Sequence, residues 1–320
     1  MKPRQRGAAL LLAMIILTLV ATLAAGMVWQ QSRSVQIEAA ERGGQQAEWI
    51  LVGALDWARL ILREDTRSGG ADHLGEPWAT PLAEARLSSF LAVDRDNNAD
   101  AGPDAFLSGT ITDAQARYNL RNLIDGEGKI VEAEQKALAR LCDAVGLPTD
   151  TPVRIAEGLR LAQTGAAATV ADSSADAPLL PSRVSQLAWL GLDAATLARL
   201  EPYVVLLPVN TPVNANTASR EVLVAAIDKL DLGTAERLVQ RRQRLPFEKL
   251  DDIQKELPSE IKADEKRVNW KTSYFFVDGR LRLEDLVLEQ RSLVERRGAD
   301  RGLEVVALQS ERRALQLAPR

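Results

Sequence analysis

The chain is poor in the side chains that carry most catalytic and metal chemistry. Its 320 residues include one cysteine, Cys142, one histidine, His73, and 14 aromatic residues. A lone cysteine excludes an intrachain disulfide and a cysteine-cluster zinc site. A lone histidine excludes histidine-rich metal sites, and any Ser-His-Asp triad would have to be built on His73.

The chain also lacks an excess of positive or negative charge. The chain carries 40 Lys and Arg against 44 Asp and Glu, a net charge of −4 at pH 7. This balance gives no general attraction to nucleic acid. Hydrophobic residues make up 46% of the chain, which is enough to build a core at this length. They are not evenly spread, however.

The longest apolar run lies near the N-terminus. Three basic residues precede Gly7, and residues 8–28, AALLLAMIILTLVATLAAGMV, contain no charge. A helix of this length spans roughly 31 Å, which matches the hydrocarbon core of a bilayer. Trp29 follows the run, where aromatic residues favour the membrane interface. Because the basic residues come first, the positive-inside rule places the bulk of the chain on the far side of the membrane.

Three interpretations of this segment compete. A secretory signal peptide would be cleaved after the small residues that end at Gly26. An uncleaved anchor explains the length of the run but not why Gly7 directly precedes it. The sequence RQRG before AALLLAMII resembles a type IV pilin leader, which is cleaved before an apolar segment that stays as the anchor. We favour this third interpretation.

A helical pattern continues beyond the apolar run. Residues 30–67 contain no proline, and apolar residues recur at helical spacing in two adjacent rows, Ile50, Ala54, Trp57 and Ile61, and Leu51, Leu55, Ala58 and Leu62. The pattern predicts an amphipathic helix that packs on a globular head. We interpret Trp49 and Trp57 as core residues of that contact.

The rest of the chain predicts a sheet interrupted by helices. Strand-like sequence over 106–123 precedes helices predicted at 131–147, 183–190, 194–200, 220–229, 234–243 and 250–256. Strands are then expected at 272–277 and 280–288, joined by a turn at Asp278-Gly279, and at 289–295 and 303–308. We also predict a short helix at 82–90 and a mobile loop at 164–178.

Several stretches resemble the minor pseudopilin K family of type II secretion systems. They are WILVGALDWARLILREDTR, ADHLGEPWA, PLAEARLSSFL, ITDAQARYNLRNL and TPVNANTASREVLVAAI, which together extend the resemblance over nearly the whole chain. The resemblance implies an α+β fold: a type IV pilin-like long N-terminal helix and antiparallel sheet, split by a large all-helical insertion of helix-hairpin-helix or SAM-like type.

The expected organisation follows from this fold. It comprises a prepilin leader peptide (1–7), a transmembrane helix (8–28), a periplasmic extension of that helix (29–67), the first part of the pilin-like body (68–130), the inserted helical domain (131–262) and the returning strands of the body (263–320).

The resemblance also implies processing, partners and location. The prepilin peptidase would cleave between Gly7 and Ala8, and the new N-terminus at Ala8 would be methylated. The mature chain then has 37 basic and 44 acidic residues, a net charge of −7. The family implies a tip complex with minor pseudopilins I and J, contacts with minor pseudopilin H and the major pseudopilin, and an inner-membrane protein whose bulk lies in the periplasm. A protein in that oxidising compartment must be stable without a disulfide.

Leu12 occupies the fifth mature position, where most pilin-like subunits have glutamate. A carboxylate inside a membrane helix is unfavourable unless it is paired. In a pilus it would pair with the N-terminal amine of the neighbouring subunit above. A subunit at the tip has no such neighbour, so Leu12 favours a tip position.

The main alternative is a membrane-anchored helix-hairpin-helix receptor for DNA. Residues 212–262 resemble such modules, whose Gly-x-Gly hairpin holds a phosphate with backbone N–H groups. Here the hairpin reads Asp231-Leu232-Gly233, with an acid in place of the first glycine. The segment has nine basic and nine acidic residues, whereas binding to a DNA backbone requires uncompensated cations. We therefore favour a structural scaffold without nucleic-acid binding, and interpret Arg241, Arg242 and Arg244 as a solvated helix end.

A second candidate site is a run of oxygen-bearing side chains at alternate positions, Asp94, Asp96, Asn98 and Asp100, with Asp104 beyond them. It imitates the start of a calcium loop, but Ala99 and Ala105 stand where an EF-hand requires Gly and Glu. Some family members bind calcium in the head, partly through acidic residues of the helical insertion that residues 156–174 lack here. We favour a charged surface turn over a calcium site.

No catalytic constellation is present in the sequence. His73 lies between Asp72 and Glu76, which could suit a general base. The chain has no accompanying nucleophile motif and no glycine-rich phosphate loop. We interpret His73 as a loop residue hydrogen-bonded to a neighbouring acid and Cys142 as a small buried apolar residue. The sequence therefore predicts an assembly protein, not an enzyme.

Overall fold

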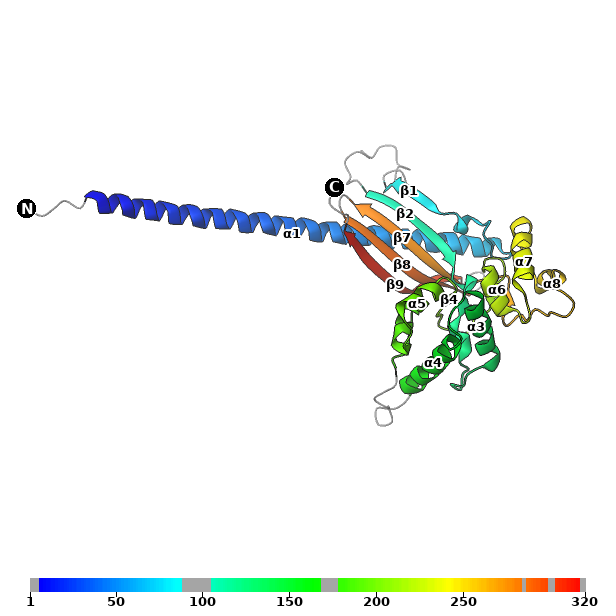
Figure 1. The fold of residues 1–320 in the computed structure, drawn as a ribbon. Coiled ribbons are helices and arrows are strands. Elements are labelled where there is room, and N and C mark those ends of the chain that lie inside the picture. Colours follow the sequence, from blue (N-terminus) through cyan, green and yellow to red (C-terminus); the bar gives the residue numbers. More distant parts are fainter. Residues whose placement is uncertain (1–5, 88–104, 168–177, 284–285, 299–302, 317–320) are drawn as a thin grey trace, which may run out of the picture.

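One continuous helix organises the molecule. A computed structural model of the chain describes residues 6–87, 105–167, 178–283, 286–298 and 303–316. Helix α1, Arg6–Ser68, runs for 63 residues. Its first half projects away from the head, and its second half crosses one face of a sheet (Figure 1). The absence of proline and the helical spacing of apolar residues over 30–67 explain why the helix continues without interruption.

The sheet has five antiparallel strands in the order β1-β2-β7-β8-β9. The strands are β1 (Leu82–Arg86), β2 (Ala105–Asp113), β7 (Tyr274–Leu283), β8 (Leu286–Arg297) and β9 (Glu304–Gln316). Strands β2 and β7 are neighbours in space although about 160 residues separate them in sequence. The intervening chain forms the helical part of the head.

Alternate residues of the sheet bury their side chains against α1. Ala47, Leu51, Ala58 and Leu62 line one side of the helix and are at most 5% exposed. They contact strand residues that include Phe275 and Leu281, which are fully buried. Trp78 from the turn η1 (Pro77–Ala79) closes this core with an edge-to-face contact to Phe275, with ring centroids 5.1 Å apart.

The helical part has a separate core. It contains α3 (Glu132–Ala144), α4 (Thr151–Ala167), α5 (Ala194–Leu200), α6 (Arg220–Ala226), α7 (Leu232–Arg244), α8 (Leu250–Lys255) and the 3-10 helix η5 (Val184–Leu190). Their apolar side chains, drawn from residues 118–268, form one cluster that includes Cys142. We call this part the helical domain.

Short strand pairs connect the helical domain internally and tie its ends together. Strand β3 (Tyr118–Asn119) pairs with β4 (Val204–Val205), and β5 (Val213–Asn214) pairs with β6 (Val268–Asn269). The predicted α+β layout, with a long helix, an antiparallel sheet and helices between its strands, is confirmed.

The structure corrects three local predictions. The helix expected at 82–90 is the edge strand β1, because pairing with β2 outweighs the helical propensity of LAEAR. Residues 88–90 lie outside the described chain. Of the loop expected at 164–178, residues 164–167 belong to α4, and 168–177 are outside the described residues. Helix α4 was otherwise missed by the sequence reasoning.

The expected turn at Asp278-Gly279 is the third correction. These residues lie in the middle of β7, opposite Thr110 and Gly109 of β2. A Cβ atom at Gly279 would stand 3.4 Å from Leu51 of α1, at the near edge of ordinary van der Waals contact.

Candidate functional site

The N-terminal half of α1 has the character of a membrane span. Residues 8–42 are all exposed, and this is the one described helix long and apolar enough to cross a bilayer. The hydroxyls of Thr18 and Thr22 donate to main-chain oxygens one turn back, which satisfies them without water. At the end of the apolar run, the Arg33 guanidinium lies 5.6 Å from the Trp29 ring centroid, a pairing that suits the interface.

The predicted processing site lies at the start of this helix. Gly7 and Ala8 are in the first turns of α1, and Leu12 is 60% exposed with only apolar neighbours in the sequence around it. Among the described residues, none from the head covers Leu12.

The prediction that Trp49 and Trp57 belong to the core is wrong. Trp49 is 75% exposed and Trp57 is 46% exposed, as is Leu60 at 44%. Trp49 and Leu60 lie on the side of α1 opposite the buried Leu51, whereas Trp57 lines a groove between the helix and Trp78. Trp49 lies in neither of the two predicted apolar rows, and Trp57 is exposed although the other members of its row are partly buried.

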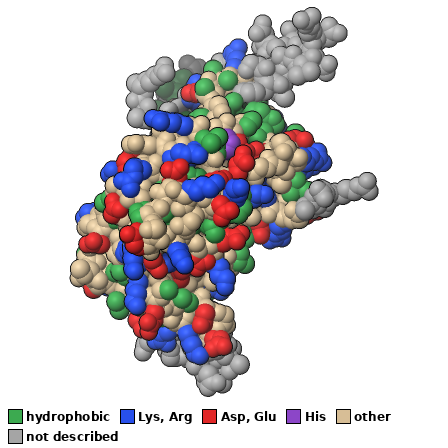
Figure 2. All heavy atoms as spheres, turned by 90° about the vertical axis from the view of Figure 1, so that its right-hand side faces the viewer, with side chains coloured by type: hydrophobic (Ala, Val, Ile, Leu, Met, Phe, Trp, Pro, Cys, Tyr) green, Lys and Arg blue, Asp and Glu red, His purple; other side chains and the backbone are tan. Residues whose placement is uncertain are grey.

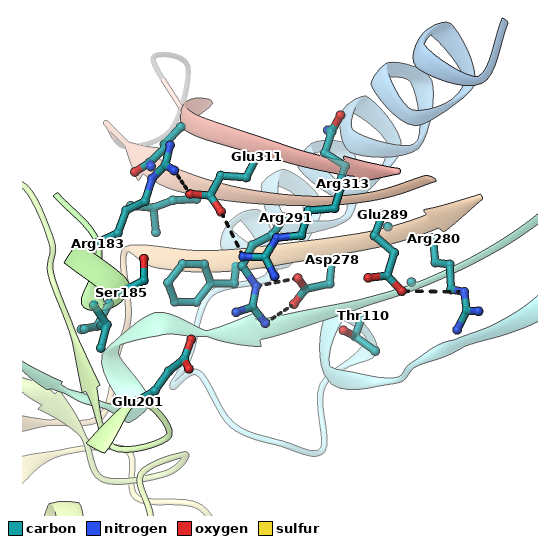
Figure 3. A pocket seen from close by; sticks show the side chains of 18 of the residues that line it. Thr110, Arg183, Ser185, Glu201, Asp278, Arg280, Glu289, Arg291, Glu311 and Arg313 are labelled. Carbon is teal, nitrogen blue, oxygen red and sulfur yellow. Dashed lines mark hydrogen bonds and ion pairs between the residues drawn. The ribbon is translucent and has the colours of Figure 1, made fainter. Parts of the chain in front are cut away.

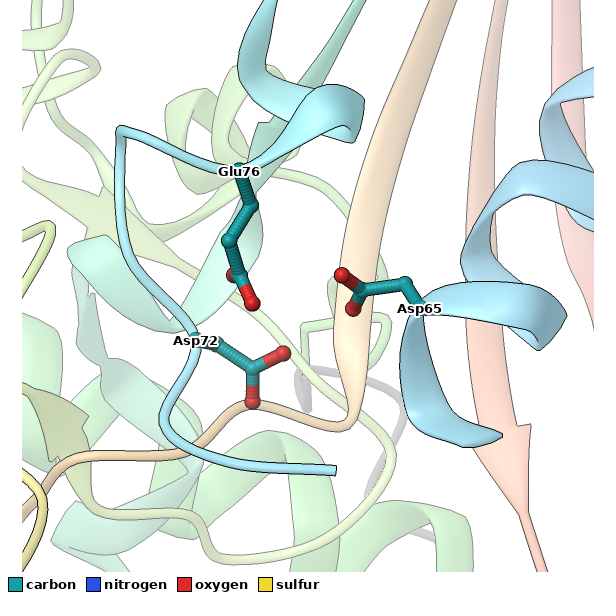
Figure 4. Close-up of side chains that lie close together, drawn as sticks. All are labelled: Asp65, Asp72 and Glu76. Atoms are coloured by element: carbon teal, nitrogen blue, oxygen red, sulfur yellow. The ribbon is translucent and has the colours of Figure 1, made fainter. Parts of the chain in front are cut away.

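Three carboxylates meet where α1 ends. Figure 4 shows Asp65 from the last turns of α1, and Asp72 and Glu76 from the loop that follows, pointing toward one another. Their nearest oxygen atoms all lie within 4.8 Å of one another. The Arg296 guanidinium of β8 donates to Asp65 at 2.9 Å and to Asp72. Because this buried arginine already supplies a cation, the cluster is a structural junction of helix, loop and sheet.

Burial controls the protonation of this junction. It raises the pKa of Asp65 to about 7, with the negative charge of Glu76 adding to the shift and Arg296 opposing it. Burial also raises the pKa of Asp72, again against Arg296. Although Arg296 is close to Asp65, one guanidinium shared between two acids does not offset the loss of water and the mutual repulsion of the carboxylates.

The stretch VNANTAS fixes the helical domain to the sheet. The Asn214 amide donates to Asp113 at 2.8 Å and to the Asp72 main-chain oxygen at 3.0 Å. Thr217 also donates to Asp113, at 2.6 Å. Asn216 accepts from the Phe247 N–H and donates to its carbonyl oxygen. Burial raises the pKa of Asp113 to about 6, and these hydrogen bonds oppose the shift. The two asparagines are buried, so their role is structural.

The hairpin between α6 and α7 does not present a phosphate cradle. The Asp231 carboxylate accepts from the Thr234 N–H at 2.9 Å and from its hydroxyl at 2.6 Å, and so caps α7. These bonds lower the pKa of Asp231. The position where a DNA phosphate would bind is therefore filled by the protein's own carboxylate. Figure 2, which views the end of the head near α7 and α8, shows basic and acidic side chains interspersed.

The basic cluster at the end of α7 is only partly solvated, contrary to prediction. Arg242 is 9% exposed and donates to the Ala215 carbonyl oxygen at 2.6 Å. Arg241 contacts Glu256 and lies over the Phe247 ring, while Arg244 is exposed. Two of the three arginines therefore hold the VNANTAS segment and its surroundings together and are not free for nucleic acid.

The remaining candidates are structural or untested. Cys142 is 2% exposed, as predicted, and burial raises the pKa of its thiol to about 12. His73 differs from the prediction in detail: its main-chain N–H donates to Glu76 at 2.8 Å, while the imidazole Nδ1 accepts from the Gly75 N–H. The candidate calcium residues Asp94, Asp96, Asn98, Asp100 and Asp104 lie outside the described residues.

Comparison with known proteins decides the family. Family models for the type II secretion system protein K match residues 116–209 and 213–268. The type II secretion system protein K of Pseudomonas aeruginosa is 30% identical over 330 residues, covering 96% of this chain and 93% of the relative. The chain belongs to the type II secretion system protein K family. This confirms the resemblance found in the sequence and the prediction of a minor pseudopilin.

Other relatives agree. The protein K of Klebsiella pneumoniae is 31% identical and covers 76% of this chain and 76% of the relative. The protein K of Pectobacterium carotovorum is 29% identical and covers 93% of this chain and 94% of the relative. A chain in the crystal structure of the GspK-GspI-GspJ complex of enterotoxigenic Escherichia coli has the same fold, with a TM-score of 0.63 at 20% identity, covering 85% of this chain and 98% of that one.

Proposed function

We propose that this protein K caps the periplasmic pseudopilus, assembling with other subunits and catalysing no reaction. The prepilin peptidase cleaves between Gly7 and Ala8, Ala8 is methylated, and residues 8–28 hold the subunit in the inner membrane with the head in the periplasm. The subunit then enters a tip complex that starts pseudopilus assembly and supports export of folded proteins across the outer membrane.

The exposed length of α1 is the observation that carries this proposal. From residue 8 to Leu60 the helix presents apolar or aromatic side chains that the described chain does not cover. A lipid bilayer can cover the first part, but Trp49 and Leu60 lie beside the head. Such exposed apolar groups mark a protein contact. The helices of other pseudopilins provide an apolar partner that covers both regions after assembly.

The proposed partners are minor pseudopilins I and J. The solved structure with this fold contains GspK together with GspI and GspJ. Minor pseudopilin H and the major pseudopilin would follow below them. Leu12 supports the tip position, because a subunit with nothing above it gains nothing from a carboxylate there. The helical domain would lie at the outer end, near secreted proteins and the outer-membrane channel.

Mass spectrometry and crosslinking test the proposal. The protein extracted from membranes should lack residues 1–7 and carry one extra methyl group at Ala8. Retention of Met1, or cleavage after residue 26, would exclude pilin-type processing. Photo-crosslinkers at position 49 should capture pseudopilin I or J, whereas crosslinks that place the chain within the shaft would exclude the tip.

Calcium binding stays a proposal from the sequence. The ligands would be the oxygen atoms of Asp94, Asp96, Asn98, Asp100 and Asp104, which are the kind that calcium prefers. Isothermal titration of the mature protein with calcium tests this proposal. The absence of both heat and a shift in melting temperature would exclude the site.

A further inference from the structure

A charged cleft lies on the side of the sheet opposite α1. It has a volume of about 560 Å³, which is within the range of pockets that bind small molecules or short peptides. Figure 3 shows its two walls: Asp278, Arg291 and their neighbours project from the strands, and Arg183, Ser185 and Glu201 belong to the helical domain. The cleft therefore lies between the two cores of the head.

The sheet wall carries charges of alternating sign. One row across the strands reads Asp278, Arg291, Glu311, and the next reads Arg280, Glu289, Arg313. Most of these groups are paired within the wall. Arg291 donates to Asp278 through two nitrogens at 2.7 and 3.2 Å, and Arg280 lies 3.8 Å from Glu289. Arg183 from the opposite wall pairs with Glu311. These side chains neutralise one another and leave little net attraction for a ligand.

Arg117 is the exception. It follows η3 (Ala114–Ala116), where the chain leaves β2 for the helical domain. Its guanidinium lies 5.3 Å from the Phe276 ring centroid, and that of Arg291 lies 5.4 Å from the same centroid. Among the described residues, no hydrogen-bond acceptor and no carboxylate within 4.0 Å pairs with the Arg117 side chain. A half-buried guanidinium with unused N–H groups thus faces a cleft.

The surroundings of Arg117 leave its charge under-compensated. Burial lowers the pKa of Arg117, and the positive charge of Arg291 lowers it further, while Asp278, Glu201 and Asp113 act in the opposite direction. A negative group brought into the cleft would replace the hydration that Arg117 has lost. Arg291 can contribute as well, because its Nη1 is not used in the pairing with Asp278.

We propose that the cleft binds a carboxylate group through the guanidiniums of Arg117 and Arg291, which both lie beside the Phe276 ring. A planar carboxylate matches the fork of a guanidinium. Asp278 and Glu201 also line the cleft, and their charges favour a singly charged carboxylate over a doubly charged phosphate. The carboxylate can come from an acidic side chain of a polypeptide or from a free small acid. This proposal does not depend on the proposed function.

Titration of the full mature chain in detergent micelles tests the site. The probes are N-acetylglycine, as a free acid, and the peptide acetyl-Gly-Glu-Gly-amide, each with one carboxylate, and acetyl-Gly-Gln-Gly-amide is the uncharged control. Calorimetry should give saturable binding for at least one acid, with a Kd on the order of 1 mM or below, and none for the glutamine peptide. Binding of the peptide but not of N-acetylglycine identifies a polypeptide ligand, and the converse identifies a free acid.

Substitutions of arginines in the cleft show where the carboxylate binds. Arg117→Gln should weaken binding about tenfold or more, since the unpaired donor is lost. Arg117→Lys keeps the positive charge but lacks the planar guanidinium, so it should weaken carboxylate binding less than Arg117→Gln does. This intermediate affinity would show that the loss of binding in Arg117→Gln is not caused by unfolding. Arg280→Gln, at a paired arginine of the same cleft, should leave affinity within about twofold. The proposal would be overturned if neither acid binds, if wild type and Arg117→Gln bind with equal affinity, or if the glutamine peptide binds as well as the acids.

Discussion

At the residue scale, the most informative group is Asp65, because its ionisation is coupled to folding. Its pKa is about 7 in the folded protein and has an ordinary value of 3.8. The folded state therefore retains a proton that the unfolded state releases. The stabilisation from this group is fully present below about pH 4 and is lost as the pH rises to about 7. Asp72 and Asp113 are shifted in the same direction.

Asp65→Asn should therefore flatten the pH dependence of stability. The variant stays neutral, so its free energy of unfolding should exceed that of the wild type by roughly 1–2 kcal/mol above pH 7, after allowance for screening, and the gain should vanish near pH 4. Urea unfolding at several pH values measures this. Asp56→Asn, an exposed acid of α1 paired with Arg59, is the control and should change little. Parallel pH profiles for wild type and Asp65→Asn would contradict the prediction.

Sequence reasoning reached some of these residues but not their grouping. Asp72 and Glu76 attracted attention through His73, yet the imidazole plays no part in the junction they form. The cationic partner of Asp72, Arg296, lies over 200 residues away in the sequence, and nothing in its sequence neighbourhood indicates the contact. At Asp231 the sequence showed an acid in place of the first hairpin glycine, and the structure adds that this acid caps α7.

At the scale of elements, two facing glycines of the sheet have neighbours of different kinds. Gly109 of β2 lies opposite Gly279 of β7. A Cβ atom on Gly109 would stand 2.8 Å from the Asp278 carbonyl oxygen, whereas on Gly279 it would be 3.4 Å from a Leu51 methyl group. The main chain of β7, which a Cβ on Gly109 would meet, cannot move as easily as the end of the Leu51 side chain.

Alanine at these two positions should therefore have unequal effects. Gly109→Ala should lower the free energy of unfolding by about 2 kcal/mol, because the backbone of a paired strand must shift. Gly279→Ala should change it by less than about 1 kcal/mol. Chemical unfolding of the two matched variants measures the difference. Equal losses would show that the sheet adjusts as readily as Leu51 does.

The two sides of α1 also have separate roles, one in the stability of the head and the other in binding to partner subunits. Leu51→Ala should destabilise the head by about 3 kcal/mol, because Leu51 is 1% exposed and its removal leaves a cavity. Trp49→Ala should leave stability within about 0.5 kcal/mol, because Trp49 is 75% exposed, but should reduce recovery of pseudopilins I and J with the protein. Thermal unfolding and co-purification provide the two readouts. Loss of stability in Trp49→Ala would place this residue in the core after all.

Elements were predictable where local pattern determines them. Helix α5 was predicted at its observed bounds, and α3, α6, α7 and α8 to within three residues at each end. Prediction failed where partners distant in sequence decide the structure. LAEAR has a helical composition and forms a strand because β2 is beside it. Asp278-Gly279 has the sequence of a turn and stays extended because it lies between two long neighbouring strands.

At the scale of the whole molecule, two cores are linked by a small polar junction. The network of Asp113, Asn214 and Thr217 joins the helical domain to the sheet, and Arg296 joins the sheet to the end of α1. An apolar cluster in which Val205 and Leu207 pack on Tyr274 and Leu293 also joins the two parts, so their relative position depends on this contact together with the buried hydrogen bonds. The family resemblance predicted both parts, but the sequence contained no indication of the bonds that orient them.

Leu12 allows a test of the position of the molecule in the filament. Leu12→Glu restores the side chain that most pilin-like subunits carry, at a site that the head does not cover. In a shaft subunit the carboxylate would find an amine above it, but at the tip it stays unpaired in an apolar environment, which costs about 3 kcal/mol. We therefore expect the variant to lower the yield of assembled pseudopilus and of secreted protein, with Leu12→Met as a control that keeps both. Wild-type assembly and secretion by Leu12→Glu would mean that a pairing partner is available, and so that the subunit does not lie at the tip.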